Sequence, residues 1–154
     1  MNYDSNNNSC IFCSIINGAI EGAIVYENND FLVIMDKYPI TTGHTLVIPK
    51  KHYDNLLFMS PKEVGELYSL VRIISKAVVS AISADGFSIG QNNGRSANQI
   101  IRHVHVHIIP RFTNDNPNGR WPTRYIANET ELLDYSEKIK NHLDPSIQSN
   151  FIVN

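Results

Sequence analysis

The longest regular hydrophobic pattern in the chain predicts an amphipathic helix that runs from Pro61 toward Ala84. Its start is well marked, because Ser60 can cap the helix, Pro61 suits the first turn and Glu63 completes a capping box. Apolar side chains then recur every three or four residues, at Val64, Leu67, Tyr68, Val71, Ile74, Val78, Ala81 and Ile82. This stripe indicates a helix packed on a sheet, so we interpret it as core or subunit interface rather than as a cofactor site.

Shorter apolar runs predict the strands of that sheet. Residues 23–26 and 31–35 are separated by Glu-Asn-Asn-Asp, a segment with the composition of a hairpin turn. Residues 44–49 and 87–92 form two further runs. The first two strands should therefore pair antiparallel.

Two shorter helices are also predicted. One ends near Gly18, and the other lies between residues 129 and 143 and is ended by Pro145. Residues 113–124 hold two prolines and the only tryptophan, which indicates a loop.

Three of the six histidines alternate with apolar residues shortly before that loop. In an extended strand His103, His105 and His107 would share one face, while Val104 and Val106 would face the core. Packing gives no reason for three imidazoles on one face, so the pattern indicates function. The triplet could bind a metal ion, or one histidine could attack an electrophile while the others supply protons.

Composition limits the class of protein. The 154 residues, of which 42% are hydrophobic and 18% charged, suit one globular domain, and a net charge of -2 gives no general attraction to nucleic acid. No apolar run approaches the ~18 residues that a membrane span requires, and the polar start does not resemble a signal peptide. We therefore expect a cytoplasmic protein, with a disordered lead-in over residues 1–9 and a C-terminal tail over residues 146–154.

Cys10 and Cys13 are the only cysteines. In a reducing compartment, their Cys-x-x-Cys spacing favours a metal site or a redox pair over a structural disulfide. No thioredoxin-like pattern surrounds them, which argues against a redox role, and two small buried thiols are the simplest alternative. The spacing suits two ligands of a tetrahedral zinc ion, whose other ligands would have to be histidines.

The histidine triplet follows a polar loop, residues 92–99, whose side chains and backbone N–H groups could line a phosphate. With that loop, His-Val-His-Val-His-Ile-Ile at residues 103–109 resembles the histidine triad (HIT) family of nucleotide hydrolases and transferases, whose motif is His-φ-His-φ-His-φ-φ with φ apolar. Cys-Ile-Phe-Cys-Ser-Ile-Ile-Asn-Gly at residues 10–18 and Gly-His-Thr-Leu-Val-Ile-Pro-Lys-Lys-His at residues 43–52 are also similar to family segments. The resemblance covers residues 10–111.

The resemblance implies an α+β fold in one domain of residues 10–145, with a five-stranded antiparallel sheet packed against one long helix and shorter ones. It also implies a homodimer whose two sheets join. Where such family members carry zinc, the ligands match Cys10, Cys13, His52 and His103. That ion would be structural, and no catalytic cofactor is implied.

By the same resemblance His105 would attack the α-phosphorus of a purine nucleoside-monophosphate-X, and water would then cleave the nucleotidyl-histidine intermediate. X could be the amine of a phosphoramidate, the second half of a dinucleoside polyphosphate, or the remaining group of an adenylated or sulfated nucleotide. The backbone carbonyl near His103 would hold His105 Nδ1–H, and His44 and His107 would stabilise charge on the phosphate. The remaining implied roles are Gln99 at the leaving group or water, Asp36 at the ribose hydroxyls, Asn92 and Asn98 at the α-phosphate, and Ile34 and Phe12 at the base.

One segment departs from the family pattern, because Asn98-Gln99-Ile100 stands where many members have Gly-Gln-Ser. Two other functions stay open. One is a nucleotide-binding regulator with an idle triad, and the other is a metal-dependent hydrolase with the triplet as its zinc site. The second is disfavoured because the segment around the triplet offers no further His, Asp or Glu ligands.

Overall fold

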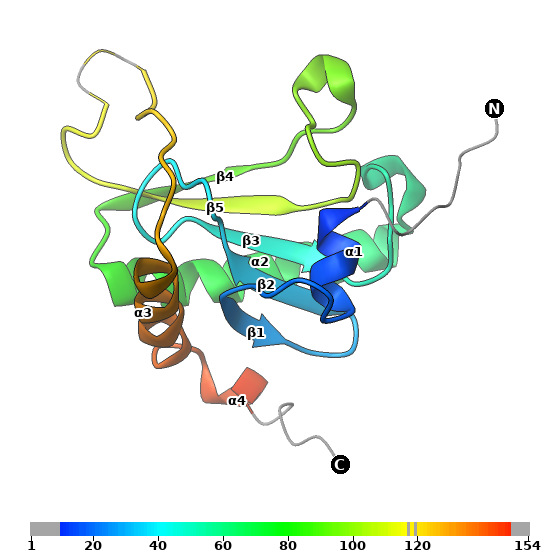
Figure 1. Cartoon of the computed structure of the whole chain (residues 1–154). Helices are drawn as coiled ribbons and strands as arrows, with labels where there is room; N and C mark the ends of the chain where they lie inside the picture. The colour runs from blue at the N-terminus through cyan, green and yellow to red at the C-terminus, as the bar shows by residue number, and fades with distance from the viewer. Residues whose placement is uncertain (1–9, 117, 119, 149–154) are drawn as a thin grey trace.

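A five-stranded antiparallel sheet forms the centre of the molecule (Figure 1). The computed structural model describes residues 10–116, 118 and 120–148. The strands are β1 (Ile24–Glu27), β2 (Phe31–Met35), β3 (Thr45–Pro49), β4 (Gly86–Gly90) and β5 (Val106–Arg111), in the spatial order β1-β2-β3-β5-β4. This arrangement confirms the predicted α+β fold.

Helices cover both faces of the sheet. The α-helices are α1 (Ile11–Ile16), α2 (Pro61–Ile82), α3 (Glu129–Lys140) and α4 (Pro145–Gln148), and two short 3₁₀ helices are η2 (Leu56–Phe58) and η3 (Arg95–Ala97). The predicted capping box starts α2, because Ser60 Oγ accepts from Glu63 N at 3.2 Å and Glu63 Oε2 accepts from Ser60 N at 2.7 Å. None of the helices in the described parts of the chain combines the length and apolar content that crossing a membrane requires.

The alternation of side chains along β2 divides the core into two layers. Phe31, Val33 and Met35 belong to the larger cluster, which includes buried residues of α2 and α3. Leu32 and Ile34 belong to a smaller cluster that α1 covers through Phe12. The strand predicted at residues 31–35 is therefore buried along its whole length and packs against helices on both faces.

One prediction about the C-terminal helices needs correction, and those about the two ends of the chain stay open. Pro145 does not end the last long helix, since α3 ends at Lys140 and Pro145 begins α4. A proline is tolerated at that position because the first N–H groups of a helix have no intrahelical partner. The lead-in over residues 1–9 and residues 149–154 of the tail lie outside the described residues, so the predicted domain boundaries stay predictions.

Candidate active site

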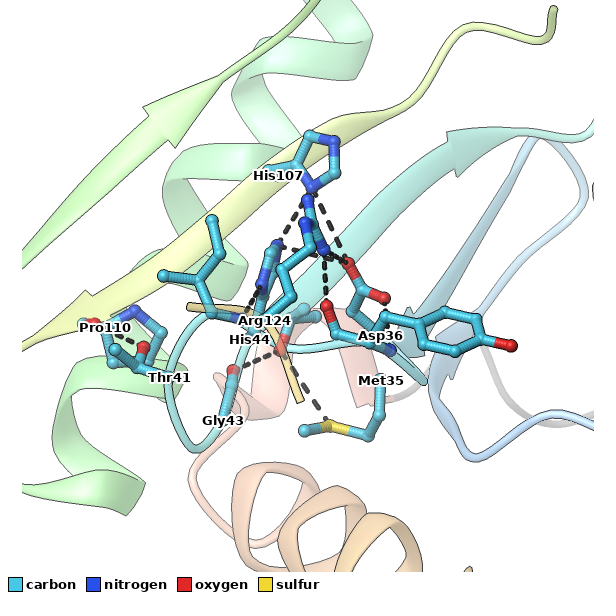
Figure 2. A network of polar contacts seen from close by, with 11 residues as sticks. Met35, Asp36, Thr41, Gly43, His44, His107, Pro110 and Arg124 are labelled. Atoms are coloured by element: carbon cyan, nitrogen blue, oxygen red, sulfur yellow. Dashed lines mark hydrogen bonds and ion pairs between the residues drawn. The ribbon is translucent and has the colours of Figure 1, made fainter. Parts of the chain in front are cut away.

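The ends of two neighbouring strands bring a carboxylate and two imidazoles together (Figure 2). Asp36 directly follows β2, and His44 directly precedes β3. Because Met35 pairs with Thr45 in the antiparallel ladder, the end of β2 lies beside the start of β3, and Asp36 N donates to His44 O at 2.9 Å. His107 reaches the same place from β5, where it pairs with Leu46.

The side chains of Asp36, His44 and His107 form a compact cluster. His44 Nε2 lies 2.9 Å from His107 Nδ1 and 3.4 Å from Asp36 Oδ2, and His107 Nδ1 lies 3.8 Å from the same carboxylate oxygen. His44 is fully buried. The fold therefore removes His44 entirely from water and leaves Asp36 and His107 with side-chain exposures of 10% and 15%.

Hydrogen bonds assign the tautomers of this cluster. Ile40 N donates to His44 Nδ1 at 3.0 Å, so the proton of a neutral His44 sits on Nε2 and points at His107 Nδ1. His107 then carries its own proton on Nε2, as a donor for a ligand. Because His44 Nδ1 accepts from Ile40 N, it carries no proton. A metal ion at His44 Nε2 would displace the only proton of the ring, so the cluster is better suited to hydrogen-bond donation than to metal binding.

His105 has the opposite tautomer. Its Nδ1 lies 2.7 Å from the carbonyl oxygen of His103 and donates to it, so Nε2 keeps a free lone pair. The His105 ring stands edge-on to the Phe12 ring, 5.1 Å away, and 5.0 Å from the His107 ring. This is the arrangement that a nucleophilic imidazole requires.

Burial keeps these histidines neutral. Loss of hydration lowers the pKa of His44 and of His107 from 6.5 to about 3, helped at His44 by the positive charge of Arg124 and at His107 by His44. Burial also lowers the pKa of His105, against the opposing effect of its bond to the His103 carbonyl. At pH 7 the site therefore offers uncharged imidazoles.

The lowered pKa values predict a pH dependence of stability. In the unfolded chain a histidine takes up its proton near pH 6.5, whereas the pKa of His44 and of His107 in the folded chain is about 3. The contribution of these two neutral histidines to the free energy of unfolding is therefore fully present above pH 6.5 and is lost as the pH falls from 6.5 toward 3. Each histidine contributes a slope of up to about 1.4 kcal/mol per pH unit. Urea unfolding between pH 4.5 and 7 should show a shallower slope for His44→Gln than for the parent chain. Exposed His142→Gln should keep the parent slope, and equal slopes in all three chains would contradict the prediction.

A second cluster brings together Cys10, Cys13, His52 and His103, whose four potential ligand atoms lie within 4.8 Å of one another. Cys10 Sγ lies 3.4 Å from His103 Nδ1, and Cys13 Sγ lies 3.3 Å from His52 Nδ1 and 3.6 Å from His103 Nδ1. With bonds of about 2.3 Å to sulfur and 2.0 Å to nitrogen, a tetrahedral zinc ion would separate sulfur from nitrogen by roughly 3.5 Å. The distances fit.

The partners of the two histidines fit a metal as well. His103 Nε2 donates to Pro49 O at 2.7 Å, and His52 Nε2 donates to Asp54 Oδ1 at 3.0 Å, so both Nδ1 atoms present lone pairs. Burial and the neighbouring Cys10 raise the pKa of the Cys13 thiol to about 11, which a bound cation would counteract by stabilising the thiolate. The four residues can therefore hold a tetrahedral metal ion.

The structure corrects the prediction that the histidine triplet shares one strand face. Only His107 lies in β5, which begins at Val106. A turn in which His103 N donates to Ile101 O precedes the strand, and Val104 N donates to Tyr53 O outside the sheet. His103 therefore points to the cysteines and His107 to Asp36, so the triplet does not form a single metal site among the described residues.

The polar loop is held by Gln99 from within. Gln99 Nε2 donates to Asp54 O at 2.6 Å and to Ile101 O at 3.1 Å, and its Oε1 accepts from Gly94 N at 2.7 Å. Contact with a leaving group would require some of these bonds to break, so the observed geometry favours a positioning role.

Two other loop residues show how the chain accommodates its departure from the family pattern. Asn98 adopts the left-handed conformation with φ of 62°, which asparagine tolerates better than most residues, so it can replace a glycine there. Its carbonyl accepts from Asn92 Nδ2 at 3.4 Å. Ile100 is 92% exposed, so its side chain is not part of the core.

The two residues expected at the base differ in position. Phe12 and Ile34 are both buried in the smaller core cluster, and Phe12 contacts the rings of His103 and His105. Phe12 thus lies next to the candidate nucleophile, whereas Ile34 lies within the apolar layer beneath α1.

Sequence reasoning missed Arg124. Its Nη1 lies 3.0 Å from Asp36 Oδ2, and it also donates to Tyr38 O (Figure 2). The two residues are 88 positions apart, and the segment that carries Arg124 has no regular pattern. Trp121, in the same segment, packs against Arg111, whose guanidinium lies 5.1 Å from its ring.

Comparison with known proteins identifies the family. A family model described as HIT domain matches residues 17–114. The chain belongs to this family. Similar solved structures include a hypothetical histidine triad nucleotide-binding protein from Sulfolobus tokodaii, with a TM-score of 0.79 and 41% identity over 86% of this chain and 91% of that one. Another is a Zn-bound histidine triad family protein from Mycobacterium smegmatis, with a TM-score of 0.80 and 31% identity over 94% and 99% of the two chains.

Two relatives carry names that state an activity. Adenylylsulfatase HINT3 of Arabidopsis thaliana is 44% identical over 70% of this chain and 55% of its own length. Adenosine 5′-monophosphoramidase hnt1 of Schizosaccharomyces pombe is 35% identical over 88% of this chain and 98% of its own. Family membership and the neutral histidine cluster together define a nucleotide-binding hydrolase.

Proposed function

We propose that this protein hydrolyses purine nucleoside-monophosphate-X substrates through a covalent nucleotidyl-His105 intermediate. The observation that carries the proposal is the bond from His105 Nδ1 to the His103 carbonyl, which leaves a free lone pair on Nε2. The ring of His107, a hydrogen-bond donor, lies beside it. The names of the two relatives support a substrate in which AMP is joined to X.

The reaction has two displacements. In the first, His105 Nε2 forms a bond to the α-phosphorus, and the bond from phosphorus to X breaks with its electron pair on X. His107 Nε2–H donates a hydrogen bond to X, which leaves as an anion or, where it is an amine, takes its proton from solvent. In the second, water attacks the phosphorus and loses its proton to solvent, and the bond from phosphorus to His105 breaks with its electron pair on Nε2. The His44 Nε2–H bond to His107 Nδ1 keeps the His107 proton on Nε2, so His107 stays a hydrogen-bond donor in both steps.

The nucleotide would be bound by groups around this centre. Asp36 accepts the ribose hydroxyls, Phe12 and Ile34 contact the base, and Asn92 and the backbone after Asn98 bind phosphate oxygens. Gln99 holds the loop that carries these donors through its bonds to Gly94 and Asp54. The reaction as proposed uses no catalytic metal.

Zinc is proposed as a structural ion at Cys10, Cys13, His52 and His103. The proposal is supported by the fit of the donor distances and by the Zn-bound relative. When bound, the ion would neutralise the two thiolates and fix the segment of His103 relative to α1. None of the steps above passes through it.

The proposal is tested by intact mass after brief mixing with adenosine 5′-phosphoramidate at mildly acidic pH. The parent chain should gain the mass of one adenylyl group, and His105→Asn should not. Consumption of substrate without any adduct, at a rate abolished by a chelator, would overturn the covalent mechanism and favour a metal-dependent hydrolase.

A homodimer is also proposed, formed along the outer edge of β4. No described strand pairs with that edge, and Phe87 and Ile89 on it are 48% and 45% exposed. Joining two sheets there would cover both side chains and satisfy the free backbone groups. Light scattering should give twice the chain mass for the parent and for the control Leu133→Lys on α3, and the single chain mass for Ile89→Lys. A monomeric parent chain would refute the proposal.

A further inference from the structure

The carboxylate proposed to bind ribose is already engaged by a cation of the same chain. Arg124 Nη1 contacts Asp36 Oδ2 at 3.0 Å, and the other carboxylate oxygen accepts from Tyr38 N at 2.8 Å. The Asp36 side chain is only 10% exposed, whereas that of Arg124 is 45% exposed. Figure 2 shows Arg124 next to Asp36, with His44 and His107 on the same side.

Backbone hydrogen bonds fix the segment that delivers this cation. Tyr125 N donates to Pro39 O at 3.2 Å and Ala127 N donates to Lys37 O at 3.1 Å, so the chain around Arg124 lies along the loop that follows Asp36. The Arg124 side chain also donates to Tyr38 O in that loop. The backbone position of Arg124 is therefore fixed by the fold, while its guanidinium, on a side chain that is 45% exposed, can change rotamer once its bonds to Asp36 and Tyr38 break.

A nucleotide must disturb this ion pair if Asp36 receives the ribose hydroxyls. Asp36 Oδ2 already faces Arg124, His44 and His107, so ribose hydroxyls that bind this oxygen compete with Arg124 for it. A guanidinium that loses a shielded carboxylate needs another anion to offset the loss. A leaving group that is sulfate or phosphate supplies that anion, in the two-pronged geometry that arginine prefers, and a neutral amine does not.

We propose that Arg124 is a specificity-determining residue that selects nucleotides whose leaving group is anionic. The inference rests on the proposed function, and in particular on Asp36 as the ribose ligand. In the free site Arg124 neutralises Asp36, and in the substrate complex it turns from Asp36 to the oxygens of the leaving group. The preferred substrates are then mixed anhydrides of a nucleoside monophosphate with sulfate or phosphate, in preference to phosphoramidates.

The test compares kcat/KM for adenosine 5′-phosphosulfate and adenosine 5′-phosphoramidate, which share one nucleotide and differ in the charge of X. Arg124→Gln should lower the value for the phosphosulfate and raise it for the phosphoramidate, so that their ratio falls at least tenfold. Arg124→Lys should keep most of the ratio because it keeps the charge. Exposed Arg120→Gln, in the same segment, should leave the ratio unchanged.

The outcomes separate this inference from the function on which it rests. An adenylyl adduct on His105 together with an unchanged ratio in Arg124→Gln would overturn the role of Arg124 alone. An equal fall for both substrates would also overturn it, since it would assign Arg124 to the shared nucleotide. Absence of an adduct in the parent chain with either substrate would instead defeat the proposed function.

Discussion

Replacing His105 by Asn is expected to lower kcat/KM for adenosine 5′-phosphoramidate by at least about a thousandfold, because no other group can form the covalent intermediate. Asparagine can still donate to the His103 carbonyl, which His105 contacts at 2.7 Å, so the site should keep its shape. The dissociation constant for AMP should therefore change only a fewfold. Steady-state kinetics and calorimetric titration of the same preparation measure both effects.

The matched control is His142→Asn, which changes an exposed histidine just after the end of α3 and should leave both constants unchanged. Two results would contradict the mechanism. Equally slow turnover in the parent and in His105→Asn, with tight AMP binding in both, would indicate a nucleotide-binding regulator with an idle triad. Fast turnover in His105→Asn that a chelator abolishes would indicate metal-dependent hydrolysis.

Local patterns carried enough information to predict most of the fold. The capping box at Ser60 and the apolar stripe after it define α2, because helix caps and helical periodicity depend on residues three or four positions apart. The two apolar runs and the turn composition after residue 26 likewise defined the β1–β2 hairpin. The error at Pro145 has the same local origin, since proline is compatible both with ending a helix and with beginning one.

The candidate site was harder to predict because its geometry depends on contacts between distant segments. Period-two spacing placed His103, His105 and His107 on one face, but the turn at Ile101 and the bond from Val104 N to Tyr53 O separate them into three environments. The Asp36–His44 contact followed from the antiparallel pairing of β2 and β3. No local signal could have paired Asp36 with Arg124, since the docking of the 124–127 segment along residues 37–39 decides it.

Removing the proposed zinc ion is expected to lower the free energy of unfolding strongly and the catalytic rate more weakly. Each zinc-binding side chain comes from a different part of the chain apart from the Cys10–Cys13 pair, so loss of the ion frees α1 from the segment of His103. We expect Cys13→Ser to unfold with a free energy at least about 3 kcal/mol lower, a fall in Tm of roughly 10 °C. Calorimetry and metal analysis should show one zinc per chain in the parent and in His142→Ala, and none in Cys13→Ser. Metal-free parent chain with an unchanged Tm in chelator would instead indicate two buried thiols.

The effect on rate follows from the double role of His103, whose Nδ1 faces the cysteines while its carbonyl oxygen holds His105 Nδ1. A chelator applied below the unfolding temperature should loosen that carbonyl and lower kcat by up to about tenfold, because a misaligned nucleophile reacts more slowly. The adenylyl-His105 adduct should still form, only more slowly, and this can be followed by rapid-mixing mass spectrometry. Complete loss of both turnover and adduct in a chain that stays folded would show that the metal acts in the reaction itself. A partial loss would show that the metal takes no part in the reaction itself and acts only through the backbone of His103.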